Sequence, residues 1–321
     1  MSAHWSERHE GGSRFALWLI RNIGLRLGRP AARLFLYPTT LYFFFRRGPE
    51  RQQSRAFLSR ALGRPASTWE VIKHIHCYAA TILDRIFLLS DSRLSDSLPR
   101  FDIRVHGLEQ LETQMAHGRG VLLLGAHIGS FEVLRVLAVE RPDVKVRVVM
   151  DTLQTPAMTA MLHALNPAVA AGVINAGQDG TAIALAIQDA ANQGALIGLL
   201  ADRARSREPT RDAAFFDSPA PFPIAPYLIA SLLKLPAVLC FGLYRGGNRY
   251  DLYFETFAEC IQIARRERDA RLGEWTQRYA ARLEHYTRLD PFNWFNFYDF
   301  WHRFDDARTA VRDSVSARSA A

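Results

Sequence analysis

Apolar and polar residues follow two different patterns along the chain, and the change comes near residue 100. Before it, residues 69–90 carry apolar side chains at helical spacing, with Ser67 or Thr68 placed to cap the helix. After it, short apolar runs alternate with longer amphipathic stretches. Strands that alternate with helices of this length are typical of parallel βαβ units, so the pattern predicts an α/β fold.

The predicted elements between residues 100 and 203 follow one another with short connections. We expect strands at 101–107, 121–126, 144–150, 172–176 and 195–202. We expect helices at 108–118, 129–140, 155–165 and 179–194. Asp179 is a favourable cap for the last of these helices, and Gly194 is a favourable end. The run 121–126 is continuously apolar, as in a strand buried on both faces of its sheet.

The last third of the chain is less regular. We predict a proline-rich loop at 215–226, a helix at 227–234, a β-hairpin at 236–257 and a charged amphipathic helix at 265–286. An aromatic stretch follows at 290–304. The whole pattern predicts one αβα domain at 67–303 around a mostly parallel central sheet. A basic, aromatic helical segment at 1–66 precedes it, and we expect the tail at 304–321 to be disordered.

Net positive charge is confined to the start of the chain. Residues 1–60 hold eleven arginines and three acids, which accounts for the whole formal charge of +8. Such asymmetry indicates a polyanionic partner, either nucleic acid or an anionic membrane surface. We expect no nucleic-acid partner, because the sequence contains no recognisable nucleic-acid-binding module and the rest of the chain is neutral.

Aromatic residues among these arginines favour a membrane surface. Rings at headgroup depth, with guanidinium groups on lipid phosphates, are typical of an interfacial anchor, and the arginines concerned are Arg21, Arg26, Arg29, Arg33, Arg46 and Arg47. The uncharged run Leu34 to Phe45 has 12 residues, against the ~20 that a spanning helix needs. Pro30 and Pro38 also interrupt a helix here, and no signal-peptide pattern is present. The alternative is a pair of amphipathic helices packed on the domain, with solvated arginines.

The cysteines and the two histidines close to Cys77 predict neither a disulfide framework nor a metal site. Cys77, Cys240 and Cys260 lie in apolar surroundings without paired spacing, which indicates a reducing compartment. His74, His76 and Cys77 have a metal-like spacing, but on a helix the two histidines point ~200° apart. We therefore predict no metal and no cofactor.

The candidate chemistry lies where the run 121–126 ends. His127 follows it, and Glu132 comes five positions later. Ligands gather beyond the carboxyl ends of strands in open α/β sheets. A turn at Gly129 would let Glu132 face the imidazole, fix its tautomer and leave the other nitrogen as a general base. Because no GxSxG motif or cysteine lies nearby, the pair would act on an external hydroxyl or water. The alternative is a helix start with an incidental histidine and a glutamate favoured by the helix dipole.

The strand–His–x4–acid block resembles the catalytic box of the lysophospholipid acyltransferase superfamily, and more closely that of the bacterial lipid A late acyltransferases. A second block, residues 194–240, is similar to the family's strand–Asp–Gln, aromatic pair, proline-rich loop, helix and following strand. The resemblance covers roughly residues 100–260, and the basic N-terminus matches the family's membrane-proximal element. The stretches HWSERHEGGSRFALWL, YFFF and NWFNFYDFW are similar to a predicted acyltransferase branch found with aryl polyene and glycolipid biosynthesis.

This resemblance implies an acyltransferase of the bacterial inner membrane, acting at its cytoplasmic face. The enzyme would move a fatty acyl group from an acyl carrier protein or CoA thioester to a hydroxyl or amine of a lipid or glycolipid. No cofactor or metal is implied. The aromatic stretch at 290–304 would line an acyl tunnel or lie at the membrane interface, or it would pack in the core.

The resemblance also implies roles for single residues. His127 would take the acceptor proton, and Glu132 would orient His127. Asp202 and Arg203 stand where the family has Asp–Gln; Arg203 would bind an acceptor or carrier phosphate, or would be an exposed loop arginine. Backbone N–H groups near Gly129 and Ser130, or in the proline-rich loop, would stabilise the oxyanion.

Three departures from the family pattern leave the acceptor open. Met150-Asp151-Thr152 stands where an arginine–proline pair usually follows the strand, Arg203 replaces a glutamine, and Ala225 replaces a glycine. Lipid A, a lysophospholipid, an ornithine lipid and a polyene lipid all fit. A thioesterase or lipid hydrolase that uses the same pair on water, and a non-catalytic lipid-binding scaffold, are the competing functions. The oligomeric state is not predicted.

Overall fold

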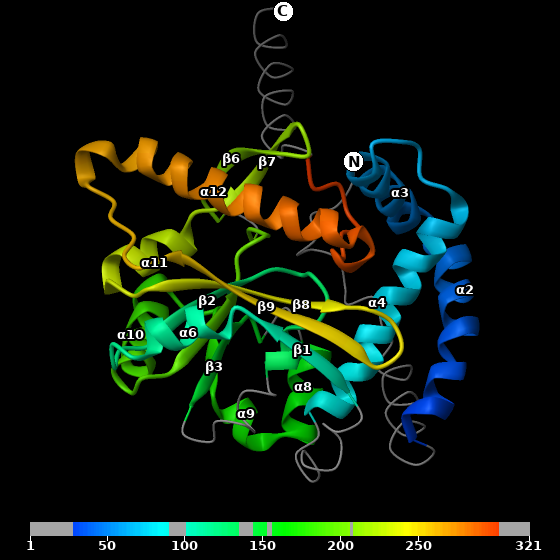
Figure 1. Cartoon of the computed structure of the whole chain (residues 1–321), viewed down its shortest axis with the longest axis horizontal. Coiled ribbons are helices and arrows are strands. Elements are labelled where there is room, and N and C mark those ends of the chain that lie inside the picture. Colours follow the sequence, from blue (N-terminus) through cyan, green and yellow to red (C-terminus); the bar gives the residue numbers. More distant parts are fainter. Residues whose placement is uncertain (1–27, 90–100, 135–143, 153–155, 206–207, 302–321) are drawn as a thin grey trace, which may run out of the picture.

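A seven-stranded sheet forms the centre of the molecule, in the order β1-β9-β8-β2-β5-β3-β4 (Figure 1). The computed structural model describes residues 28–89, 101–134, 144–152, 156–205 and 208–301. The strands of this sheet are β1 (Asp102–His106), β2 (Val121–Gly125), β3 (Val146–Met150), β4 (Val173–Asn175), β5 (Leu196–Leu200), β8 (Ala237–Tyr244) and β9 (Arg249–Ala258). Only the β8–β9 pair is antiparallel among these neighbours. The predicted α/β fold with a mostly parallel sheet is confirmed.

Helices cover both faces of the sheet, because the side chains of its central strand alternate between two apolar clusters. Leu122 and Leu124 of β2 belong to one cluster, and Val121 and Leu123 belong to the other. The first face packs against α3 (Gly48–Leu62), α10 (Gly180–Asn192), α11 (Ala225–Leu233) and α12 (Arg268–Leu289). The second face packs against α4 (Thr68–Leu89), α6 (Leu108–Met115), α8 (Pro156–Leu165) and α9 (Pro167–Ala171).

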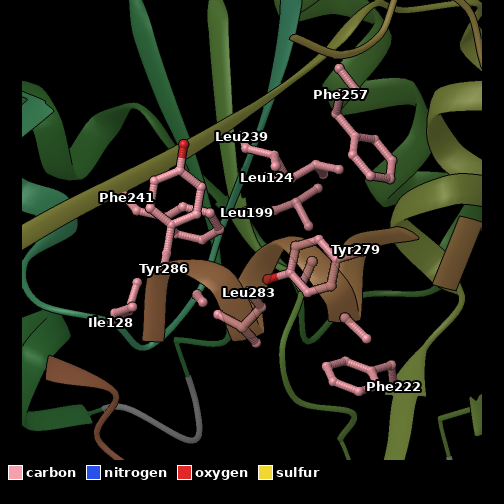
Figure 2. Close-up of a cluster of buried hydrophobic side chains, with 14 of the residues drawn as sticks. Leu124, Ile128, Leu199, Phe222, Leu239, Phe241, Phe257, Tyr279, Leu283 and Tyr286 are labelled. Atoms are coloured by element: carbon pink, nitrogen blue, oxygen red, sulfur yellow. The ribbon is translucent and has the colours of Figure 1, made fainter. Parts of the chain in front are cut away.

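Figure 2 shows the first cluster at the place where α12 crosses the sheet. Leu124, Leu199 and Leu239 come from β2, β5 and β8, and they lie beside Tyr279 and Leu283 of α12. Burying one such side chain contributes about 1.5–3 kcal/mol relative to its exposure. The core therefore holds the carboxyl ends of β2 and β5 in fixed positions relative to each other and to β8.

The predicted helix caps are confirmed. The Asp179 carboxylate accepts hydrogen bonds from the backbone N–H groups of Thr181 and Ala182, at 2.9 and 3.0 Å. At the start of α4, the Glu70 N–H donates to the Ser67 hydroxyl, and the Ser67 N–H donates to the Glu70 carboxylate. This reciprocal pair is a capping box, which satisfies two N–H groups that the helix leaves without partners.

The N-terminal helices correct two predictions. One is that Pro30 and Pro38 interrupt a helix, and the other is that Arg29 and Arg33 face lipid phosphates. Residues 28–34 are helical, and α2 (Leu36–Arg46) contains Pro38 without interruption. Proline is tolerated there because N–H groups in the first turn have no partner within the helix. Figure 1 shows α2 at the outer edge of the molecule, alongside α4.

Arg29 and Arg33 point into the protein and not toward lipid phosphates. Arg29 donates to both Asp84 oxygens, at 2.7 and 2.8 Å, and Arg33 donates to the Tyr244 hydroxyl at 2.5 Å. The Tyr250 hydroxyl also donates to Asp84. A buried carboxylate needs such partners, so these arginines stabilise the fold. Arg21 and Arg26 lie outside the described residues.

The predicted proline-rich loop is wrong, because residues 218–223 form a strand. β6 (Thr210–Phe215) and β7 (Ser218–Pro223) make an antiparallel hairpin that turns through Phe216 and Asp217, both at positive φ. Pro219, Pro221 and Pro223 alternate along β7, so their missing N–H groups all fall on one edge of the strand. A two-stranded pair leaves that edge unpaired, which is why three prolines fit.

Two further predictions are tested only in part. The start of the predicted helix 129–140 is a 3-10 turn, η3 (Phe131–Leu134), and the remainder lies outside the described residues. The aromatic stretch packs in the core as far as it is described, with Trp294 at 0% and Phe300 at 2% exposure. The tail at 304–321 lies outside the described residues. Among the described helices, none is long and apolar enough to cross a bilayer.

Candidate active site

His127 and Asp202 meet because each follows the end of one of two neighbouring parallel strands. Gly125 of β2 lies in register with Leu200 of β5, and the two titratable residues come two positions later on their strands. The His127 Nδ1 atom lies 2.8 Å from Asp202 Oδ1. The sheet therefore builds an imidazole–carboxylate pair at the edge where ligands bind in open α/β folds.

Asp202 is fully buried and fully engaged. Its second oxygen, Oδ2, accepts the indole N–H of Trp294 at 3.1 Å and lies 3.4 Å from Arg203 Nε. Burial alone would raise the pKa of this carboxyl group. The neighbouring His127 and Arg203 and the hydrogen bonds outweigh burial, so the pKa of Asp202 lies well below its usual range. Asp202 is therefore a carboxylate at neutral pH.

The His127 ring is set up to accept a proton. About a third of the side chain, 35%, is exposed. Since Nδ1 faces a buried carboxylate, the open side of the ring is the opposite edge, which carries Nε2. Burial and the positive charge of Arg203 lower the pKa of His127, although Asp202 acts in the other direction. The imidazole is therefore neutral near pH 7.

The predicted turn at Gly129 is present and requires glycine. Gly129 has φ +59°, and a Cβ atom there would lie 1.8 Å from the Gly242 carbonyl oxygen of β8. The Gly129 N–H donates to Asn293 O, and the Ser130 N–H donates to Gly242 O, both at 2.8 Å. These two amides bind protein carbonyls in this structure, so neither points its N–H at an oxyanion. Their role toward substrate stays a prediction.

Glu132 does not occupy the position predicted for it. Its carboxylate accepts the Ser130 hydroxyl at 2.9 Å and pairs with Arg85 Nε of α4 at 2.7 Å. The 3-10 turn η3 and the guanidinium group of Arg85 on α4 hold the Glu132 carboxylate away from His127 Nδ1. The structure therefore places Asp202, and not Glu132, at the Nδ1 atom of His127.

Arg203 lies beside Asp202, with its side chain turned into the protein. Its side chain is 10% exposed, donates to Phe295 O at 2.5 Å and stacks over the Tyr298 ring. The alternative of an exposed loop arginine is wrong. The predicted phosphate contact stays a prediction, and no part of the described geometry turns this guanidinium group outward.

Another arginine reaches the neighbouring strand end. Arg205 pairs with Asp151, the residue that follows β3, at 3.7 Å, and donates to Ala176 O at the end of β4. About a third of its side chain is exposed, 34%. The position at which the resemblance leads us to expect an arginine therefore has a guanidinium group nearby, supplied by the loop after β5.

Sequence reasoning did not predict that Trp294 and His74 lie beside the site. His74 Nε2 lies 3.0 Å from Trp294 O, and His74 Nδ1 lies 2.7 Å from the Ser54 hydroxyl. Burial lowers the pKa of His74 to about 4, so the ring is neutral. The aromatic density of 290–304 was the only available signal, and it does not indicate which ring contacts Asp202.

Comparison with known families gives one extensive match. The family described as bacterial lipid A biosynthesis acyltransferase matches residues 17–303, which include both strand-end loops and the described part of the aromatic stretch. Comparison with curated proteins gives no match.

Proposed function

Because the chain belongs to the bacterial lipid A biosynthesis acyltransferase family and is an acyltransferase, we propose that His127 is its general base. In this proposal the enzyme moves a fatty acyl group from a carrier-protein or CoA thioester to a hydroxyl or amine of a membrane lipid. The observation that carries the proposal is the 2.8 Å contact between His127 Nδ1 and the buried Asp202, with the other ring edge open. A histidine held in this way has one nitrogen fixed and one available for proton transfer.

The chemical step follows from that arrangement. His127 Nε2 removes the proton of the acceptor O–H or N–H while the acceptor atom attacks the thioester carbonyl carbon. The tetrahedral intermediate then collapses, the carbon–sulfur bond breaks, and the imidazolium returns its proton to the leaving thiolate. Asp202 accepts the Nδ1–H throughout and balances the positive charge that forms on the ring.

The two carboxylates of the site have different roles in this proposal. Asp202 orients His127, since it is the group at hydrogen-bond distance. Glu132 fixes the loop that presents His127, since it binds Ser130 and Arg85. In place of the predicted pairing of His127 with Glu132, one acid orients the imidazole and the other fixes the loop.

We also propose that the outer face of α2 lies on an anionic membrane, such as the cytoplasmic face of the inner membrane. Six large apolar or aromatic side chains on and before this helix are 46–74% exposed: Leu34, Phe35, Tyr37, Leu41, Tyr42 and Phe45. Arg46 and Arg47 follow at its end. An exposed apolar stripe beside cations is the composition of an interfacial helix. A lipid acceptor would then meet His127 without leaving the bilayer.

The test is the His127→Ala variant, supplied with an acyl thioester and an extract of bacterial lipids. We expect acyl transfer to fall at least ~100-fold, the scale of a lost general base, while circular dichroism reports an unchanged fold. Mass spectrometry of the lipids identifies the acceptor by the added acyl chain. Near-normal transfer by the variant would remove His127 as base. Free fatty acid without any acylated lipid in the wild-type reaction would instead indicate a thioesterase.

A further inference from the structure

A segment remote in sequence pairs with the His127 loop. The Phe295 N–H donates to His127 O at 2.9 Å, and the Gly129 N–H donates to Asn293 O at 2.8 Å. Between these two bonds, Ile128 and Trp294 form an antiparallel bridge. The backbone that carries His127 is therefore paired with residues 293–295 by two hydrogen bonds, one before and one after Ile128.

The side chain of Trp294 continues this contact into the catalytic pair. Its indole N–H donates to Asp202 Oδ2 at 3.1 Å, while Asp202 Oδ1 lies 2.8 Å from His127 Nδ1. Trp294 is completely buried. With one partner on each oxygen, the carboxylate has no freedom to rotate, and the plane of the carboxylate is fixed relative to the imidazole.

His74, Phe57 and Phe215 hold Trp294 in place. Its carbonyl lies 3.0 Å from His74 Nε2, and its ring packs edge-on against Phe57 and Phe215, with centroids 4.9 and 5.1 Å away. Edge-to-face packing of this kind restricts the ring to one orientation. The indole N–H is therefore directed at Asp202 by the surrounding core.

We propose that Trp294 is a positioning residue of acyl transfer, whose indole N–H holds Asp202 in the orientation that His127 requires. This inference rests on the proposed role of His127 as general base. A carboxylate that loses one donor becomes a stronger proton acceptor toward its remaining partner. Loss of the indole N–H would thus stabilise the imidazolium form of His127, and a larger fraction of the enzyme would be protonated at a given pH.

Other charged or titratable groups that face the pair are unchanged in such an experiment. They are Arg203 beside Asp202, Arg85 of α4 with its partner Glu132, Tyr279 of α12, Tyr298 of the aromatic stretch and His74 behind Trp294. A shift in the pH profile on removing the indole is therefore assigned to the Asp202 contact.

The experiment compares Trp294→Phe with Trp301→Phe. Trp301 belongs to the same aromatic cluster, with its ring 6.2 Å from that of Trp294, but its indole N–H donates to Phe215 O. We expect Trp294→Phe to lower kcat about tenfold with little change in KM, and to move the acid limb of kcat/KM upward by about half a pH unit or more. Trp301→Phe should keep the wild-type profile. Identical pH profiles for both variants would overturn the proposal.

A measurement on the wild-type protein covers the case in which Trp294→Phe does not fold. The six tryptophans are labelled with nitrogen-15, and their indole signals are followed by NMR across the acid limb. The Trp294 signal, assigned by elimination with Trp→Phe variants at the other five positions, should titrate with the same midpoint as activity. An unchanged Trp294 signal through that range would overturn the proposal without any variant of Trp294.

Failure of this inference can be told apart from failure of the proposed function. If His127→Ala remains active, His127 is not the base, and the wider proposal fails whatever Trp294→Phe does. If His127→Ala is inactive and Trp294→Phe behaves like Trp301→Phe, only the role of Trp294 fails.

Discussion

Asp202 and Glu132 differ in what surrounds each carboxylate. Asp202 is fully buried, with His127 and Trp294 on its two oxygens. Glu132 is partly exposed and bound to Ser130 and Arg85. Only the first arrangement fixes the tautomer of the His127 ring, so substitution of the two acids should have unequal effects.

We predict that Asp202→Asn lowers kcat by on the order of 100-fold or more, because the amide cannot balance the charge of the imidazolium. Asp202 raises the pKa of His127, so its loss should also move the acid limb of kcat/KM to lower pH, opposite to the shift expected for Trp294→Phe. Glu132→Gln keeps an acceptor for the Ser130 hydroxyl and should cost less than about tenfold. Steady-state kinetics measured between about pH 5 and pH 9, a range that spans the reference pKa of histidine, checks both predictions. A larger loss for Glu132→Gln than for Asp202→Asn would reverse the assignment.

The sequence located His127 and Asp202 individually but paired His127 with the wrong acid. Both residues follow buried strands, which is why the pattern singled them out. Which acid reaches the imidazole depends on β2 and β5 being neighbours in register, and residue spacing along one strand–loop unit carries no information about that. A short spacing such as that of Glu132 is visible in a sequence, whereas a tertiary contact is not.

At the scale of single elements, α2 stands out because it is apolar on two faces. Leu36 and Phe44 face the core, while Tyr42 and Phe45 are among the exposed side chains on its outer face. A helix that only packed on the domain would present polar residues outward. An exposed apolar face of this kind is typical of an interaction surface, and this supports the proposed membrane contact.

We predict that replacing Phe35, Tyr42 and Phe45 together by serine weakens binding to anionic lipid vesicles about tenfold or more. Full burial of one such ring contributes about 1.5–3 kcal/mol, and a loss of about 1.4 kcal/mol from the three partly buried rings together already corresponds to tenfold. Leu232→Ser on α11 and Leu185→Ser on α10 are the controls, since these leucines are also well exposed, at 71% and 61%. Vesicle flotation measures the bound fraction. Equal binding by the triple variant and the controls would show that α2 is not the membrane-binding face.

The elements that the sequence predicted well are those in which local signals agree. Helix α10 has its cap at Asp179 and its glycine at 194, and β2 is a continuous apolar run. β7 was missed because three prolines normally exclude a strand, and only its place in a two-stranded hairpin makes them acceptable. The inward direction of Arg29 and Arg33 was equally hidden, since it depends on Asp84, far along the chain.

For the molecule as a whole, His74 connects three parts of the fold. Its ring joins Ser54 of α3 and the carbonyl of Trp294 from its own position on α4. Because burial lowers its pKa to about 4, the folded protein holds this ring neutral at pH values where the unfolded chain would protonate it. The associated stability is complete above pH ~6.5 and is lost as the pH falls toward 4.

We predict that the free energy of unfolding of the wild type falls by about 3 kcal/mol more than that of His74→Gln between pH 7 and pH 4. Glutamine can hydrogen-bond but does not titrate, so the variant should lack this part of the acid destabilisation. Urea unfolding at both pH values, followed by circular dichroism, measures the difference. Parallel losses in the two proteins would mean that His74 is not a source of acid sensitivity.

The pairing of the His127 loop with residues 293–295 also bears on the order in which the protein is synthesised. All seven strands of the sheet are encoded before residue 259, whereas Trp294 is translated later. A ribosome-bound chain with a finished sheet still lacks the groups that fix His127 and Asp202. Under the proposed mechanism, unfinished protein would therefore not consume acyl thioesters, because His127 would become competent as a base only after α12 and the segment that follows it have left the ribosome.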